Sequence, residues 1–154
     1  MNEIKTQQQE ATSVLQKKGT CIEFFSAYQE MDLERMLNLC TPESIVYFEP
    51  LDGAGTGLVH ELGKNIWTAL MDCFPDLDNT VTSLEWMEAQ HAVKCRVSIF
   101  GTQQKDFAGI PAHGLRFDSE HIFIFKFDDQ SHVTELRVLW DHDKFVQQLT
   151  PAAR

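Results

Sequence analysis

One alternating run in the second half of the chain places a single titratable side chain among aromatic rings. If residues 117–127 form a strand, one face carries Phe117, Ser119, His121, Phe123, Phe125 and Phe127, because successive side chains of a strand point to opposite faces. Burial lowers the pKa of a histidine, and a nearby carboxylate raises it. His121 is therefore either a buried core histidine or an acid or base in the wall of an apolar pocket.

A carboxylate follows the last strand-like run. Asp141 comes directly after Trp140 and opens a predicted helix over residues 141–149. Aspartate is a preferred N-cap residue, so capping alone would account for it. Alternatively its carboxyl group lies at the mouth of an aromatic cavity, where desolvation would raise its pKa toward the range useful for proton transfer. Both interpretations stay open.

The other polar motifs exclude several kinds of chemistry. His113, in the turn at residues 109–114, is either an exposed loop residue or a lid contact. The six histidines are scattered without metal-ligand spacing, so we expect no metal or cofactor. The glycine-rich residues 52–57 lack the phosphate-loop pattern, and no G-x-S-x-G nucleophile elbow is present. Acid–base chemistry on a neutral, apolar substrate fits better.

Composition narrows the class of protein. The 154 residues suit one domain, and the net charge of −10 disfavours nucleic acid and anionic membrane surfaces as partners. Eleven Phe and three Trp need a large core, an apolar pocket or a subunit interface. The N-terminus has no apolar segment typical of a signal peptide, so we expect a cytoplasmic protein whose four cysteines are buried free thiols.

Periodicity predicts an α+β fold with helices on one face of a curved sheet. Helical spacing covers residues 10–30, with a second possible start at residue 20, and then residues 33–40, 64–74 and 141–149. Strand patterns cover residues 44–49, 80–87, 92–100, 115–127 and 133–140. Short turns between the last four strands predict an antiparallel meander. We expect a polar N-terminal extension at residues 1–9, a single domain at 10–150 and a tail at 151–154.

Several short motifs occur in an order that resembles one family. They are Glu30–Leu33, Gly63–Ile66, Phe74–Leu77, Gly101-Thr102, residues 109–114, Trp140-Asp141 and Gln147–Leu149. Over roughly residues 20 to 150, the chain resembles SnoaL-like polyketide cyclase domains of the nuclear transport factor 2-like superfamily. The resemblance implies a cone-shaped, curved antiparallel sheet wrapped around helices and a deep apolar cavity. It also implies a homodimer formed through the convex face of the sheet.

The resemblance further implies a site. Cyclases of this family use a pocket aspartate as general acid/base in an aldol ring closure, without metal or cofactor, and Asp141 matches that position. A histidine is its usual companion, and strand parity nominates His121. Phe48, Trp67, Phe100 and Phe123, with His113, would line the pocket around a small hydrophobic molecule.

Three functions remain open at this point. The first is a cofactor-independent cyclase or isomerase that uses Asp141. The second is a non-catalytic protein that binds a small apolar molecule, in which Asp141 only caps the last helix. The third is an interaction module whose aromatic residues fill a dimer interface rather than a cavity. This superfamily hosts isomerases, dehydratases, hydrolases and binding domains, so the fold alone does not choose between them.

Overall fold

Four α-helices and six β-strands make up the described part of the chain. The computed structural model describes residues 2–152, with side chains from residue 11 onward. The elements are α1 (Asn2–Gln29), α2 (Leu33–Asn38), β1 (Cys40–Phe48), β2 (Thr56–Leu58), α3 (Lys64–Cys73), β3 (Asp78–Met87), β4 (Ala92–Thr102), β5 (Arg116–Phe127), β6 (Val133–Leu139) and α4 (His142–Gln148). Every predicted helix and strand is present, and β2 is a further short strand that follows the glycine-rich segment.

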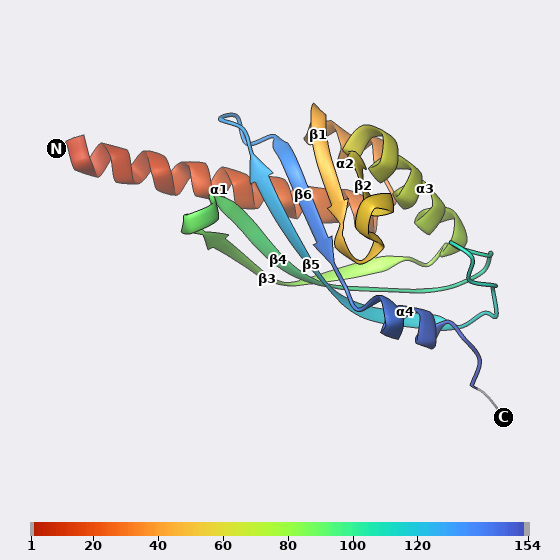
Figure 1. Ribbon diagram of the computed structural model, residues 1–154. Helices are drawn as coiled ribbons and strands as arrows, with labels where there is room; N and C mark the ends of the chain where they lie inside the picture. The colour runs from red at the N-terminus through yellow and green to blue at the C-terminus, as the bar shows by residue number, and fades with distance from the viewer. Residues whose placement is uncertain (1, 153–154) are drawn as a thin grey trace.

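The six strands form one open, curved sheet in the order β2-β1-β6-β5-β4-β3 (Figure 1). Strands β3 to β6 pair antiparallel, as the meander predicts. The sheet is nevertheless mixed, since β1 runs parallel to β6, with Val46 opposite Leu136. The expectation of an entirely antiparallel sheet is wrong for this pair. Parallel neighbours need a long connection, and the whole segment from β2 to β5 supplies it.

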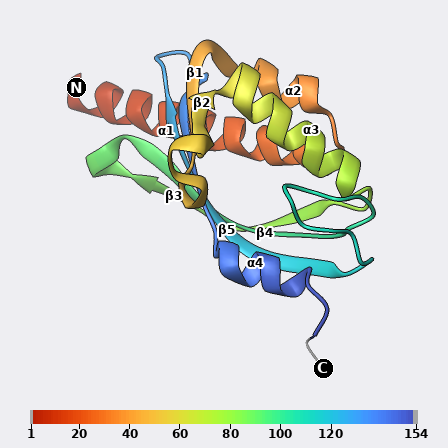
Figure 2. The same cartoon turned by 45° about the vertical axis from the view of Figure 1, so that its right-hand side comes forward.

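The helices cover the concave side of the sheet. Figures 1 and 2 show α1 crossing the sheet, α2 and α3 on the side of β1 and β2, and α4 where β6 ends and β5 begins. The predicted α+β class, with a curved sheet around helices, is confirmed. Because β2 and β3 remain as sheet edges, the sheet is not a closed barrel.

Helix α1 is one continuous helix from Asn2 to Gln29 and does not restart at residue 20. It crosses the predicted boundary at residues 9 and 10 between extension and domain. Its second half supplies the buried residues Cys21, Phe24, Phe25, Ala27 and Tyr28, whereas Leu15 is 69% exposed. Met1 of the predicted extension and residues 153–154 of the predicted tail lie outside the described residues.

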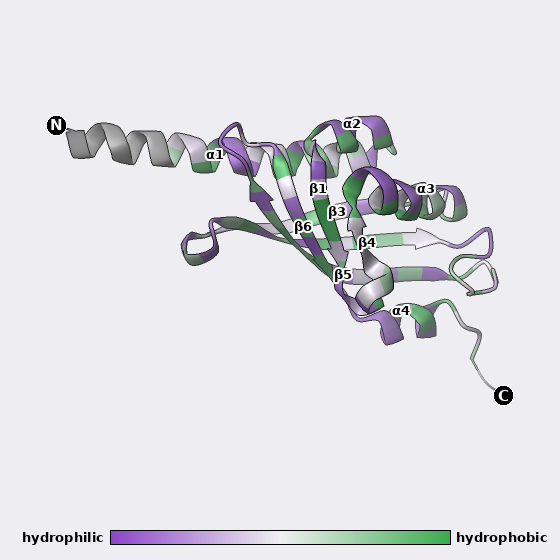
Figure 3. Cartoon of the chain, turned by 45° about the horizontal axis from the view of Figure 1, so that its top comes forward, coloured by the Kyte–Doolittle hydropathy of each residue, from purple (hydrophilic) through white to green (hydrophobic). Residues whose placement is uncertain are grey.

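Aromatic rings form much of the core between α1 and the sheet. The Phe24 ring packs at about right angles against Phe25, Trp67 and Phe125, with centroids 5.2–5.6 Å apart. Such edge-to-face pairs add stability beyond the area they bury. All four cysteines are free and buried, which confirms that part of the sequence prediction. Figure 3 shows polar and apolar stretches alternating along β5 and β6, as expected for strands with one buried face.

Candidate functional site

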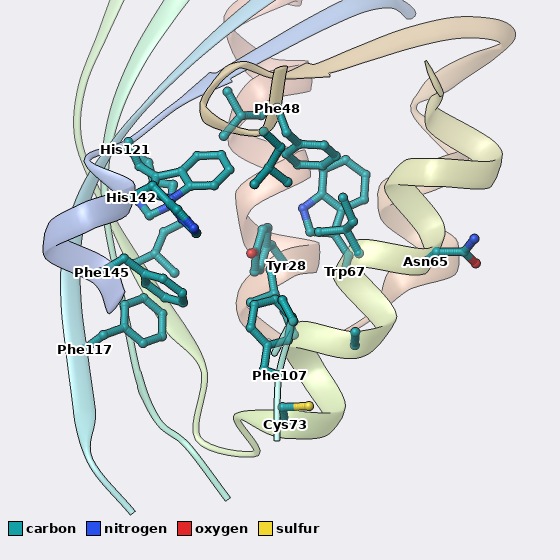
Figure 4. A pocket seen from close by; sticks show the side chains of 18 of the residues that line it. Tyr28, Phe48, Asn65, Trp67, Cys73, Phe107, Phe117, His121, His142 and Phe145 are labelled. Atoms are coloured by element: carbon teal, nitrogen blue, oxygen red, sulfur yellow. The ribbon is translucent and has the colours of Figure 1, made fainter. Parts of the chain in front are cut away.

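A cavity of about 330 Å³ lies between the concave face of the sheet, α1, α3, α4 and the loop at residues 106–108. Its walls are mainly aromatic and aliphatic side chains. The aromatic ones are Tyr28, Phe48, Trp67, Phe107, Phe117, Phe123, Trp140 and Phe145 (Figure 4). Among the residues whose side chains the structure describes, no lysine or arginine lines the cavity, and the only acidic lining residue is the exposed Asp106. The cavity therefore suits an uncharged ligand, because a buried anion would find no cationic partner.

His121 lies on the inward face of β5 and lines this cavity. Its ring stacks on Trp140, with centroids 5.5 Å apart and planes 18° apart. Its Nδ1 lies 3.2 Å from the carbonyl oxygen of Ser119. A carbonyl oxygen only accepts hydrogen bonds, so Nδ1 carries the proton and Nε2 of the neutral ring is an acceptor. Burial lowers the pKa of His121 to about 4, which keeps the ring neutral near pH 7.

His142, the first residue of α4, lines the same cavity. Its Nδ1 accepts a hydrogen bond of 3.2 Å from the indole Nε1–H of Trp140. An indole N–H only donates, so Nδ1 is unprotonated and the neutral ring carries its proton on Nε2. The two cavity histidines therefore have opposite tautomers. His121 offers an acceptor at Nε2, and His142 offers a donor at Nε2.

Four of the seven residues predicted for the site line the cavity, namely Phe48, Trp67, His121 and Phe123. Phe100 does not. Ile99 occupies the inward position of β4, so Phe100 points to the outer face, where the Arg116 guanidinium lies 5.0 Å from its ring centre. His113 is exposed and does not line the cavity either, although residues 106–108 of the same loop do. The predicted placement of Phe100 and His113 is wrong.

The predicted placement of Asp141 is also wrong. Its side chain is exposed and absent from the cavity lining, and Oδ1 accepts a hydrogen bond of 3.0 Å from the backbone N–H of Lys144. This is the N-cap of α4. Strand β6 has ended at Leu139, but the backbone stays extended through Asp141. The alternation therefore continues, so that Trp140 and His142 face the cavity while Asp141, between them, faces solvent. The carboxyl group is therefore not poised at the cavity mouth.

Most of the cavity lining was not predicted from the sequence, including His142 and Tyr28. His142 belonged to a dense Asp-His-Asp cluster whose orientation could not be read from spacing, because consecutive residues at a helix start point in different directions. Tyr28 falls on the apolar face of the predicted first helix, which was a signal for burial but not for contact with a cavity. Among the described residues, no group of three or more His, Cys, Asp or Glu could hold a metal ion.

No helix in the described part of the chain is both long and apolar enough to cross a membrane.

Comparison with solved structures gives the same fold at low sequence identity. AclR from Streptomyces galilaeus superposes with a TM-score of 0.73 at 23% identity, over 88% of this chain and 97% of that one. IdmH from Streptomyces antibioticus gives 0.72 at 21% identity, over 86% and 97%. A SnoaL-like protein from Jannaschia sp. CCS1 gives 0.77 at 20% identity, over 90% and 94%.

No curated protein matches the chain significantly in sequence. The family model of the SnoaL-like polyketide cyclases does match, over residues 20–149, which is most of the chain. That range begins within α1 and ends just after α4, so it includes all six strands and every element that lines the cavity. The chain therefore belongs to the SnoaL-like polyketide cyclase family.

Proposed function

We propose that the chain is a cofactor-independent acid–base enzyme, a cyclase or isomerase, acting next to a carbonyl group of a small hydrophobic, polyketide-like molecule. His121 is the proton acceptor through Nε2, and His142 is a hydrogen-bond donor through Nε2–H. The observation that carries the proposal is the pair of hydrogen bonds, at Nδ1 of His121 and at Nδ1 of His142, that assign opposite tautomers to two histidines in one apolar cavity. An acceptor and a donor are the two groups that removal of a proton next to a carbonyl requires.

The two histidines and the substrate account for every proton and electron pair in the reaction. A proton leaves the carbon next to the carbonyl for Nε2 of His121, and the electron pair of the C–H bond forms an enolate. In ring closure the enolate carbon bonds to a second carbonyl carbon of the same molecule, and the resulting alkoxide takes the proton back. In isomerisation the proton returns to a different carbon. The enolate offsets the cost of a buried imidazolium, because opposite charges formed side by side stabilise each other.

In this proposal His121 takes the role that the family resemblance assigned to Asp141. The structural neighbours do not share one chemistry, since AclR is described provisionally as a hydroxylase and IdmH provisionally as a polyketide cyclase. Fold similarity does not decide the reaction, and the residues of the site must decide it.

Exchange of the α-protons of β-tetralone in D₂O, followed by NMR, tests the proposal. This flat bicyclic ketone enolises without any cofactor. We expect wild-type protein to accelerate exchange and His121→Gln to slow it by about 10²–10⁴-fold, the usual contribution of a positioned base. The matched control is His132→Gln, which removes an exposed histidine at the turn between β5 and β6. Equal exchange by wild type and His121→Gln would refute the role of His121.

The pH dependence of this exchange gives an independent check. A base with a pKa of about 4 stays deprotonated through the neutral range, so kcat/KM should be nearly flat between about pH 5 and pH 8. A histidine with the ordinary pKa of about 6.5 would instead lose activity roughly 30-fold on going down to about pH 5. The drop expected here begins only as pH falls toward the lowered pKa. Circular dichroism at each pH would show that the protein stays folded.

A second candidate is a non-catalytic protein that binds an apolar molecule. The capping role of Asp141 favours it, since the carboxylate that the family resemblance assigned to catalysis lies outside the cavity. This candidate predicts that β-tetralone binds and raises the melting temperature, while its α-protons exchange no faster than in buffer.

A further inference from the structure

Tyr28 is a buried residue of the cavity wall whose hydroxyl group has no hydrogen-bond partner in the described part of the chain. The residue is 2% exposed, and its ring packs against Phe24 in the second half of α1. It lines the cavity, and no hydrogen bond joins its hydroxyl to another group in the part of the chain that the structure describes. The hydroxyl is therefore free to donate to a ligand in the cavity. One such hydrogen bond contributes about 0.5–1.5 kcal/mol.

The hydroxyl group of Tyr28 points toward the two cavity histidines. Figure 4 shows the Tyr28 oxygen turned across the cavity, toward the wall that carries His121 and His142. Burial raises the pKa of Tyr28, since the phenolate would lose its hydration. The group therefore remains an O–H donor at neutral pH and cannot act as a base.

We propose that Tyr28 donates a hydrogen bond to an uncharged oxygen of the ligand and thereby orients it against His121. The cavity is lined by both Tyr28 and His121, which offer a donor and an acceptor, and no described lysine or arginine lines it. This arrangement selects ketones, enols and esters rather than carboxylates or phosphates. The inference rests on the proposed function only where it says that His121 reacts with the oriented ligand. The hydrogen bond from Tyr28 to the ligand oxygen does not require that the protein be an enzyme.

Calorimetric binding of β-naphthol and of naphthalene tests the inference. β-Naphthol is a stable aromatic enol, and naphthalene is the same ring system without the oxygen. We expect wild-type protein to bind β-naphthol more tightly than naphthalene. Tyr28→Phe should weaken β-naphthol about tenfold, the equivalent of one hydrogen bond, and leave naphthalene within about twofold. Phenylalanine keeps the ring that packs on Phe24, so folding is preserved.

The chain contains its own matched control. Its second tyrosine, Tyr47, lies on the outer face of the sheet, where the Arg137 guanidinium is 4.1 Å from the ring centre. Tyr47→Phe removes the same hydroxyl outside the cavity and should change neither affinity. If Tyr28→Phe bound β-naphthol as tightly as wild type, or if wild type did not prefer β-naphthol to naphthalene, the inference would be overturned.

The outcome is separable from that of the proposed function. If β-tetralone exchange is absent but the β-naphthol preference depends on Tyr28, the proposed enzyme activity fails and the recognition role stands. If exchange depends on His121 but Tyr28→Phe retains the β-naphthol preference, the reverse holds. If both hold, Tyr28→Phe should also slow exchange at saturating β-tetralone by roughly tenfold, because the donor is most needed as negative charge develops on the oxygen.

Discussion

The directions of three consecutive side chains decide what the C-terminal segment contributes to the cavity. Trp140 turns inward and provides both a stacking surface for His121 and the N–H that fixes the tautomer of His142. Asp141 turns outward and caps α4. Trp140 is thus a positioning residue that connects the two histidines, although it takes no proton itself.

Substitution of Asp141 separates a capping role from a catalytic one. Asp141→Ala should lower the free energy of unfolding by about 1 kcal/mol, the usual cost of losing an N-cap side chain. Asp141→Asn should cost little, since asparagine caps as well. Urea unfolding measures the stabilities. Both variants should catalyse β-tetralone exchange at the wild-type rate, and a large loss of exchange in Asp141→Asn would restore the catalytic role assigned from the sequence.

Alternation of side chains gives the correct direction for the site residues wherever the backbone is extended. His121 and Phe123 lie two apart on β5, so their shared inward face followed from the pattern. Phe100 also lies within a strand, but its interpretation as a wall residue rested on its type rather than on its parity with Ile99. The same alternation continues past the end of β6, since Val138, Trp140 and His142 line the cavity and Asp141 does not. The interpretation of Asp141 as a cavity residue rested on the family motif rather than on its parity with Trp140. Tautomers depend on hydrogen-bond partners brought together by folding.

At the scale of the elements, two glycines in helical surroundings have opposite roles. Gly19 lies inside α1, and a Cβ there would meet no atom within 4 Å. Gly63 precedes α3, and a Cβ there would lie 2.7 Å from the Trp67 ring. Trp67 is 1% exposed and is held between Phe24 and Phe48, so its ring has little freedom to move aside.

Alanine at each of these glycines tests that difference. Gly19→Ala should raise the free energy of unfolding by about 0.5–1 kcal/mol, because alanine loses less backbone entropy in a helix. Gly63→Ala should lower it by about 1–3 kcal/mol through overpacking against Trp67. Urea unfolding of both variants beside wild type measures whether each substitution raises or lowers the free energy of unfolding. Stabilisation by Gly63→Ala would show that Trp67 moves easily, contrary to its packing.

Most elements could be predicted because their periods are regular and their ends carry Asp, Pro or Gly signals. The prediction failed where a local signal was weaker than tertiary packing. The sequence allowed a second helix start at residue 20, yet the first helix is continuous because Cys21, Phe24 and Phe25 anchor its second half. The parallel pairing of β1 with β6 joins residues about ninety positions apart, for example Val46 and Leu136, and no local pattern specifies such a partner.

At the scale of the whole molecule, the outer face of the sheet has the composition of a small interface. Ile122 and Ile124 of β5 point outward beside Leu139 of β6, which is 37% exposed. Ion pairs surround them, with Arg96–Glu120 at 2.8 Å and Lys126–Glu135 at 3.8 Å. An apolar centre with a charged rim is typical of protein interfaces. The homodimer expected from the family resemblance would use this face.

Charge inserted at the centre of this face tests the dimer. In the strand register Ile124 lies between Lys94 and Arg137, so a monomer tolerates Ile124→Glu, whereas a dimer would bury the carboxylate. We expect wild type to sediment at twice the chain mass and Ile124→Glu at the chain mass. The matched control is Ile22→Glu on α1, where Ile22 is 56% exposed and away from the sheet face. The Ile22→Glu variant should remain dimeric. A monomeric wild type, or a dimer unaffected by Ile124→Glu, would show that two copies do not meet through this face.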